Sequence, residues 1–192
     1  MKSHILPLVF SILLISCYTS SSDKSDNLLF RGTNAYYNSR NEYMTRCIFE
    51  EVANRKESVS NAQRAYAIVY LAKLKLKHGD INSANNLLEK AENICKDFPY
   101  KYELMRDFYK AHNNHDAVKK YNELLSKWIN YRINELDNNT FDIDNLEFIN
   151  VRSYVNGEFE REFFPMYDLK KPKEFRIRLY KKYLNDKLLD IK

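Results

Sequence analysis

Glycine and proline are scarce in this chain, which has only 3 glycines and 4 prolines among 192 residues. Both residues interrupt helices and strands, so their scarcity predicts a chain that consists mostly of regular secondary structure. It also argues against phosphate-binding loops of the glycine-rich kind, because such loops need several glycines close together. The 15 tyrosines and 11 phenylalanines instead supply large side chains for a core.

The short motifs of common catalytic sites are also missing. The chain contains no G-x-S-x-G, no H-E-x-x-H and no P-loop sequence. Glu158, Glu160 and Glu162 alternate, but carboxylates at this spacing are typical of the solvated face of a strand. His112 and His115 lie in a polar break between helices, and no further ligand cluster accompanies them. We therefore expect a protein that is not an enzyme and that binds no metal ion or other cofactor.

Charge and cysteine content set two further limits. The chain has 31 Lys and Arg against 26 Asp and Glu, a formal net charge of +5. A nucleic-acid-binding domain normally shows a larger basic excess or a basic stripe, so we expect no nucleic-acid partner. Cys47 and Cys95 fall on apolar helical faces, where small buried thiols are the usual interpretation and a disulfide between them is the alternative.

The longest apolar run, Ile5 to Ile15, is too short to cross a bilayer as a helix, which takes ~20 residues. Lys2 precedes the run and the small residue Ser16 follows it, as in a cleaved export signal. The segment Leu14-Ile15-Ser16-Cys17 resembles the lipobox of bacterial lipoproteins. In that family the cysteine is acylated, for example with palmitate, and becomes the first mature residue. An ordinary secreted protein with Cys17 beside its cleavage site is the alternative.

The resemblance implies that residues 1–16 are a signal peptide and that Cys17 carries a covalent lipid. Residues 17–26 are short, polar and without an apolar period, which predicts a flexible lipidated tether. On this interpretation a lipid anchor holds the chain at a membrane of the bacterial cell envelope, on the periplasmic face or the cell surface.

Between residues 27 and 138, apolar residues recur at helical spacing, and short polar breaks separate the helices. Gly79 permits a tight turn, and Asp80 can cap the helix that follows it. Ala84 and Ala117 lie about 33 residues apart, which is close to the ~34-residue tetratricopeptide period. Small residues at these positions allow the two helices of a hairpin to approach closely.

The second helices resemble those of the tetratricopeptide family, in which a small residue is followed four positions later by a large one. The matching residues are Ala84, Leu88 and Ala91 in one repeat and Ala117, Tyr121 and Leu124 in the next. The first-helix pattern of the family is mostly missing. The resemblance implies a mainly α fold, a solenoid of about three degenerate helical hairpins over residues 27–138. A helical bundle without repeats is the alternative.

Residues 139–192 differ in pattern and predict a small α+β appendage that resembles no family. Asn156-Gly157 between two β-rich runs is a strong hairpin signal, and a two-residue turn pairs Val155 with Glu158. Apolar residues then alternate from Phe175 to Leu179, which favours another strand, although a final helix is the alternative.

In the tetratricopeptide family the first helix of each pair lines a concave groove. On that resemblance, aromatic and cationic side chains line the groove here; aromatic rings offer contact area, and cations select acidic partners. These residues are Tyr36, Tyr66, Lys73, Lys77, Tyr102, Arg106, Tyr109 and Lys110, with Tyr37 beside Tyr36. Packing of the tyrosines between helices is the alternative interpretation.

The sequence therefore predicts a non-catalytic binding or scaffold lipoprotein whose groove holds an envelope or external protein, with an acidic or extended segment as ligand. Two alternatives stay open. One is a surface adhesin whose basic tail, Lys170 to Lys182, binds acidic host molecules. The other is an envelope enzyme whose site has no recognisable motif.

The lipid anchor can be tested on the native protein. Mass spectrometry is expected to show a chain that lacks residues 1–16 and carries acyl mass on Cys17, because signal cleavage exposes this residue. The Cys17→Ala variant is expected to leave the detergent phase in a partitioning experiment. A mature chain that begins elsewhere, or a Cys17→Ala variant that still enters the detergent phase, would contradict the lipoprotein interpretation.

Overall fold

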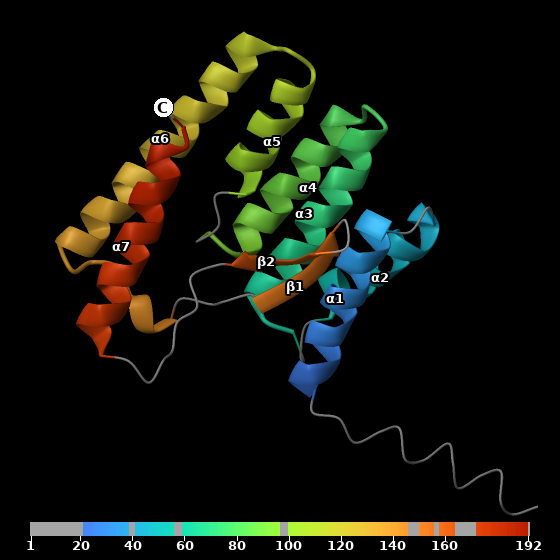
Figure 1. The fold of residues 1–192 in the computed structure, drawn as a ribbon, viewed down its shortest axis with the longest axis horizontal. Coiled ribbons are helices and arrows are strands. Elements are labelled where there is room, and N and C mark those ends of the chain that lie inside the picture. Colours follow the sequence, from blue (N-terminus) through green and yellow to red (C-terminus); the bar gives the residue numbers. More distant parts are fainter. Residues whose placement is uncertain are drawn as a thin grey trace, which may run out of the picture.

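The computed structural model describes residues 21–38, 41–55, 59–96, 100–145, 150–155, 158–163 and 172–191. Within these ranges it contains seven α-helices, one short 3-10 helix and two strands (Figure 1). The helices are α1 (Ser21–Asn38), α2 (Glu42–Asn54), α3 (Asn61–Lys77), α4 (Ile81–Ile94), α5 (Tyr100–Ala111), α6 (His115–Asp137) and α7 (Lys173–Leu189), with η2 (Ile143–Asn145) as the 3-10 helix. The prediction of a mainly helical chain is confirmed.

The N-terminal predictions fall largely outside the described residues. These are the signal peptide, residues 1–16, and the lipid attachment at Cys17. The first helix, α1, begins at Ser21, inside the segment 17–26 that the sequence assigns to the tether. None of the helices in the described ranges combines the length and the apolar character that a membrane crossing requires.

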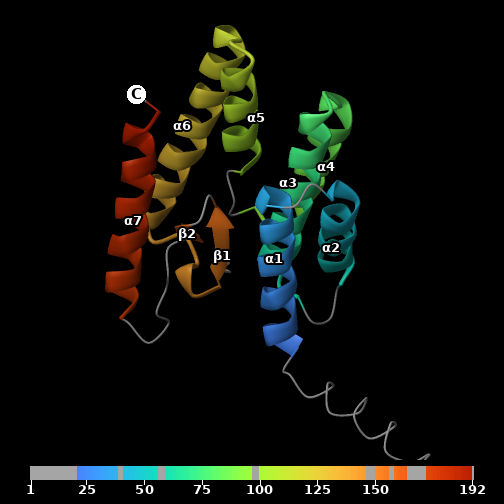
Figure 2. The same ribbon diagram turned by 45° about the vertical axis from the view of Figure 1, so that its right-hand side comes forward.

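The first six helices form three consecutive pairs, α1 with α2, α3 with α4, and α5 with α6 (Figures 1 and 2). In the first pair, Gly32 permits a close approach, since a Cβ atom there would lie 2.8 Å from a ring carbon of Phe49. The helix α3 also contacts α1, α2 and α5. Its residues Ala67 to Tyr70 are consecutive and all buried, so the middle of α3 is covered on every side.

The turns inside the second and third pairs have the same backbone geometry. Gly79 has a φ of +73° and Asn113 a φ of +55°, both in the left-handed region. In each turn the next residue, Asp80 or Asn114, donates its N–H to the carbonyl five residues back, at 3.0 Å. Both side chains then accept a hydrogen bond of 3.1 Å from the backbone N–H three residues further on. The same helix ending and the same cap therefore recur about 34 residues apart.

Two hydrophobic cores lie under these helices. The larger one is built from α1 to α5 and includes Phe49, Tyr70 and Met105. The second lies where α7 packs along α6, and Tyr183 of α7 contacts both cores. The fully or almost fully buried residues of the second core are Leu125, Ile129, Leu136, Ile143, Tyr180 and Leu184.

The strand expected from Phe175 to Leu179 is wrong, because this segment belongs to the helix α7. Its buried residues, Arg176, Tyr180 and Leu184, follow the four-residue spacing of a helix rather than the alternation of a strand. Arg176 is buried, and its guanidinium contacts the carboxylate of Asp144 in η2. Because an arginine is not counted among apolar residues, the helical spacing of the buried positions is not visible in the sequence.

Two strands, β1 (Asn150–Val155) and β2 (Glu158–Phe163), pair in antiparallel order, with Val155 opposite Glu158. The turn residues between them lie outside the described part of the chain. The strand β1 contacts α1, and both views show β1 beside that helix (Figures 1 and 2).

The C-terminal segment does not stand apart from the helical body at residue 138. Two ion pairs join α7 to the helices before it, Lys181 to Asp137 of α6 and Lys187 to Glu103 of α5. The second core lies between α6 and α7, so removing α7 exposes apolar side chains of α6. The boundary that the sequence placed between residues 138 and 139 therefore does not separate two packing units.

Ala84 and Ala117 hold equivalent positions in the sequence but differ in burial. Ala84 is fully buried, whereas Ala117 is partly exposed. We expect Ala84→Leu to lower the free energy of unfolding by about 1–3 kcal/mol, because the larger side chain overpacks the crossing of α3 and α4. Ala117→Leu is expected to lower the free energy of unfolding by a smaller amount. Urea unfolding followed by circular dichroism measures both, and equal losses would contradict this difference.

Candidate functional site: the tyrosine cluster and its cationic edge

Four tyrosines from α1 and α3 pack around one another, and we call Tyr36, Tyr37, Tyr66 and Tyr70 the tyrosine cluster. The ring of Tyr70 lies edge-on to Tyr36, with centroids 5.2 Å apart, and its other neighbour Tyr66 lies at 5.0 Å. Phe49 of α2 stacks on the same ring at 4.7 Å. Tyr70 therefore lies at the centre of the cluster and joins three helices.

Hydroxyl contacts connect the cluster from its buried side to its exposed side. The hydroxyl of Tyr66 donates a hydrogen bond of 3.3 Å to the hydroxyl of Tyr70. The hydroxyls of Tyr70 and Tyr37 also lie 3.3 Å apart. Tyr66 is 1% exposed and Tyr70 is fully buried, whereas Tyr37 is 38% exposed. Contact with buried neighbours thus holds an exposed tyrosine in place.

The burial of Tyr66 corrects the groove predicted from the sequence. Tyr66 was expected to face a partner, but α1 packs against this part of α3, and Tyr66 lies in the core. Tyr36 is partly buried between Tyr37 and Tyr70. For Tyr66, the alternative that these tyrosines pack between helices is confirmed.

Two lysines of α3, Lys73 and Lys77, follow Tyr70 on the same helical stripe toward the exposed end of the helix. The ammonium of Lys73 is 4.1 Å from the ring centroid of Tyr70, a cation–π contact. Lys77, one helical turn further on, has a 63% exposed side chain and lies 3.5 Å from a carboxylate oxygen of Glu42. Together with Tyr37, these residues form what we call the cationic edge: Tyr37, Lys73 and Lys77.

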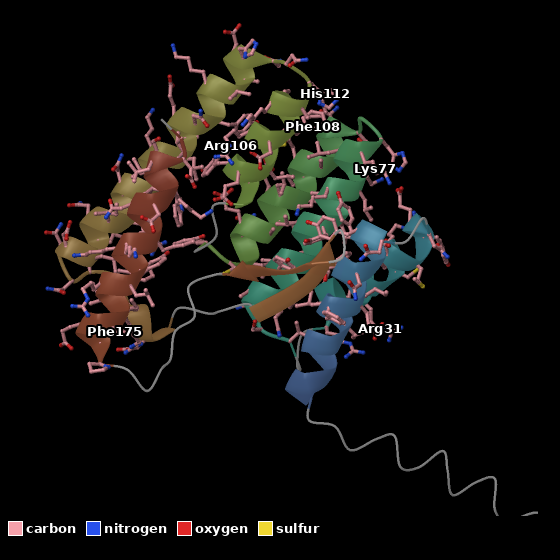
Figure 3. All side chains as sticks on the ribbon, in the orientation of Figure 1. Arg31, Lys77, Arg106, Phe108, His112 and Phe175 are labelled. Carbon is pink, nitrogen blue, oxygen red and sulfur yellow. The ribbon has the colours of Figure 1, made fainter. Side chains whose placement is uncertain are left out.

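The four predicted residues of α5 lie in different surroundings. Tyr102 packs into the second core, and burial raises its pKa. Tyr109 stacks on Tyr121 of α6 with ring centroids 5.8 Å apart. Arg106 contacts Asp107 at 2.8 Å, and Lys110 is exposed. Figure 3 shows Lys77 near the end of α3 and Arg106 on α5.

The structure thus divides the eight predicted residues among separate packing groups. Tyr36, Tyr66 and Lys73 meet around Tyr70, whereas Tyr102 packs against the second core and Tyr109 stacks on Tyr121 of α6. Sequence reasoning missed Tyr70, although it falls on the helical stripe that joins residues 66, 73 and 77.

Sequence reasoning also missed Glu42, which joins the start of α2 to the end of α3. Its carboxylate contacts His78 and lies near Lys77. The hydrogen bond from His78 is the main cause that holds the pKa of Glu42 below its ordinary value. These residues are 35 or more positions apart in the chain, so no local pattern in the sequence indicates the contact.

No group of three or more His, Cys, Asp or Glu residues that could hold a metal ion occurs in the described ranges. Cys47 and Cys95 are not joined by a disulfide in this structure. No protein-family model, no curated protein and no solved structure matches this chain.

The hydroxyl of Tyr70 can be tested by its removal. Tyr70→Phe keeps the ring but loses contacts to two other hydroxyls, one of them buried, and we expect a loss of about 1 kcal/mol in unfolding free energy. Tyr37→Phe is the matched control, and its loss is expected to be smaller because its side chain reaches solvent. Urea unfolding measures both. A larger loss for Tyr37→Phe would show that the buried hydroxyl does not stabilise the cluster.

Proposed function

We propose that the protein is a lipid-anchored lipoprotein of the bacterial cell envelope that acts as a non-catalytic protein-binding module. The segment Leu14 to Cys17 supports the anchor. The helix pairs, and the turn geometry that recurs at Gly79 and Asn113, support a tetratricopeptide-like arrangement of the helical body. In this proposal the lipid on Cys17 is the one non-protein group of the molecule.

The observation that carries the proposal is the cationic edge. Tyr37 exposes part of its ring while its hydroxyl contacts the buried Tyr70, so little conformational entropy is lost when a partner binds it. Lys73 adds a positive charge over the ring of Tyr70, whose hydroxyl contacts that of Tyr37, and Lys77 adds an exposed one a helical turn further along α3. An aromatic anchor with adjacent cations suits an acidic or extended segment of a partner protein.

The position of the edge on the helix fits a membrane-anchored protein. Tyr37 follows the start of α1 at Ser21 by 16 residues, which is roughly 24 Å along a helix. Lys77 is the last residue of α3, which runs beside α1 in the same direction (Figures 1 and 2). Tyr37 and Lys77 therefore both lie at the helix ends opposite the start of α1, which is the end nearest along the chain to the proposed lipid on Cys17.

The basic tail gives less support to the adhesin alternative. Three cations of this tail already face carboxylates of the same chain: Lys173 and Arg176 face Asp144, and Lys181 faces Asp137 of α6. Ion pairing alone does not separate the two surfaces, because Lys77 of the cationic edge likewise lies 3.5 Å from Glu42; the partly exposed Tyr37 favours the edge.

The proposed partner can be found by crosslinking in intact cells and pull-down of the lipidated protein. We expect the combined variant Tyr37→Ala, Lys73→Ala and Lys77→Ala to lose the partner, because it removes the ring and both cations. The matched control on α6 is Tyr131→Ala, Lys119→Ala and Lys127→Ala, which changes the same residue types at exposed positions. This control is expected to keep the partner.

Two results would contradict the proposal. One is a partner that survives the triple change on the cationic edge but is lost with the control on α6. The other is the absence of any partner together with a hydrolase activity of the purified protein. Higher salt is expected to weaken an authentic complex at this edge, since the Debye length falls from ~10 Å at 0.1 M to ~3 Å at 1 M.

A further inference from the structure

A pocket of about 320 Å³ lies between α2, α3 and α4, on a different face of α3 from the tyrosine cluster. Its volume lies at the small end of the range for ligand sites, which runs from roughly 300 to 1,000 Å³. A small molecule therefore fits, whereas a folded domain does not.

The floor of the pocket is apolar. It is made by Leu71 and Leu74 of α3 and by Leu87 of α4. Leu74 is almost fully buried, and the other two leucines are partly buried. A branched or aromatic side chain in the pocket would therefore cover apolar surface that otherwise contacts water.

The rim carries charges of both signs in equal number. Glu42, Arg46 and Glu50 recur every fourth residue along one stripe of α2, and Lys75 and His78 lie opposite on α3. Apart from His78, the two carboxylates and the two cations cancel. The rim therefore has no net preference for an anion or a cation.

The charged side chains in the middle of the rim form only weak ion pairs with their neighbours. Arg46 lies 3.8 Å from Glu50, and both side chains are 52% exposed. Lys75 lies 3.6 Å from Asp80, and these two side chains are about half exposed. Exposed ion pairs at such distances contribute little stability, so a ligand can replace them at small cost. Glu42, by contrast, is held by His78 and Lys77 at one end of the pocket.

We propose that this pocket binds a free apolar α-amino acid of about the size of leucine. Its side chain lies on the three leucines, its carboxylate faces Arg46 and Lys75, and its ammonium group faces Glu50. A ligand with a single charge would be repelled by the rim residues of the same sign. An uncharged apolar ligand would displace water from the charged rim residues without replacing the hydrogen bonds of that water. The proposal does not depend on the lipid anchor or on the protein partner.

The test is isothermal titration of the purified full-length protein with four ligands. Leucine is expected to bind. Glycine lacks the side chain, N-acetyl-leucine lacks the ammonium charge and leucinamide lacks the carboxylate, so each is expected to bind at least roughly tenfold more weakly. Equal affinity for leucine and leucinamide, or no heat with leucine up to about 10 mM, beyond the range of weak complexes, overturns the proposal.

Variants of the rim separate this pocket from other sites. Arg46→Gln and Glu50→Gln are expected to weaken leucine binding roughly tenfold or more, since each removes a charged partner of the ligand. Arg178→Gln makes the same change at an exposed position of α7, on the opposite side of the molecule from α2, and is expected to bind leucine like the unchanged protein (Figures 1 and 2). The proposed site is wrong if Arg46→Gln leaves leucine binding unchanged. The proposed ligand is wrong if leucyl dipeptides bind and leucine does not.

Discussion

The middle of α3 is buried on every side, and this constraint decides where the neighbouring helices lie. Successive residues of a helix point about 100° apart, so the four buried residues from Ala67 to Tyr70 point in all directions around the axis. Burial of such a segment requires contacts all around it, and α1, α2, α4 and α5 all contact α3. A helix that is apolar all round belongs in the interior, whereas a surface helix keeps one polar face.

Both surfaces that we connect with binding lie at the edges of this central helix. On one face, Tyr70 holds Tyr37 and Lys73 in place, and on another, Leu71 and Leu74 form the floor of the pocket. A well-packed interior allows few alternative side-chain positions, so groups that rest on it are preorganised for binding. The close approach of α1 and α2 at Gly32 contributes to this order, because Phe49 packs between that glycine and Tyr70.

Local features of the fold could be predicted because they depend on neighbouring residues. Gly79 and Asp80 make the expected turn and cap, since a positive φ and a side-chain acceptor are properties of single residues. The prediction failed at α7, where the apolar alternation from Phe175 suggested a strand. On that helix Arg176 is buried and contacts the carboxylate of Asp144, 32 residues earlier in the chain, and no local pattern indicates this contact.

By itself, the sequence determined that the chain is mainly helical, where the turn at Gly79 and the cap at Asp80 lie, and which residue types lie on the helix faces. The tertiary structure alone decided which tyrosines are buried and which reach solvent. Tyr36, Tyr66 and Tyr70 carry the same side chain, but their exposure depends on whether another helix covers them. Glu42 likewise contacts His78, and residues of α2 line the pocket together with Leu71, although these residues are far apart in the chain. Such contacts arise only when the helices pack, because helical periodicity gives the direction of a side chain and not the identity of its neighbour.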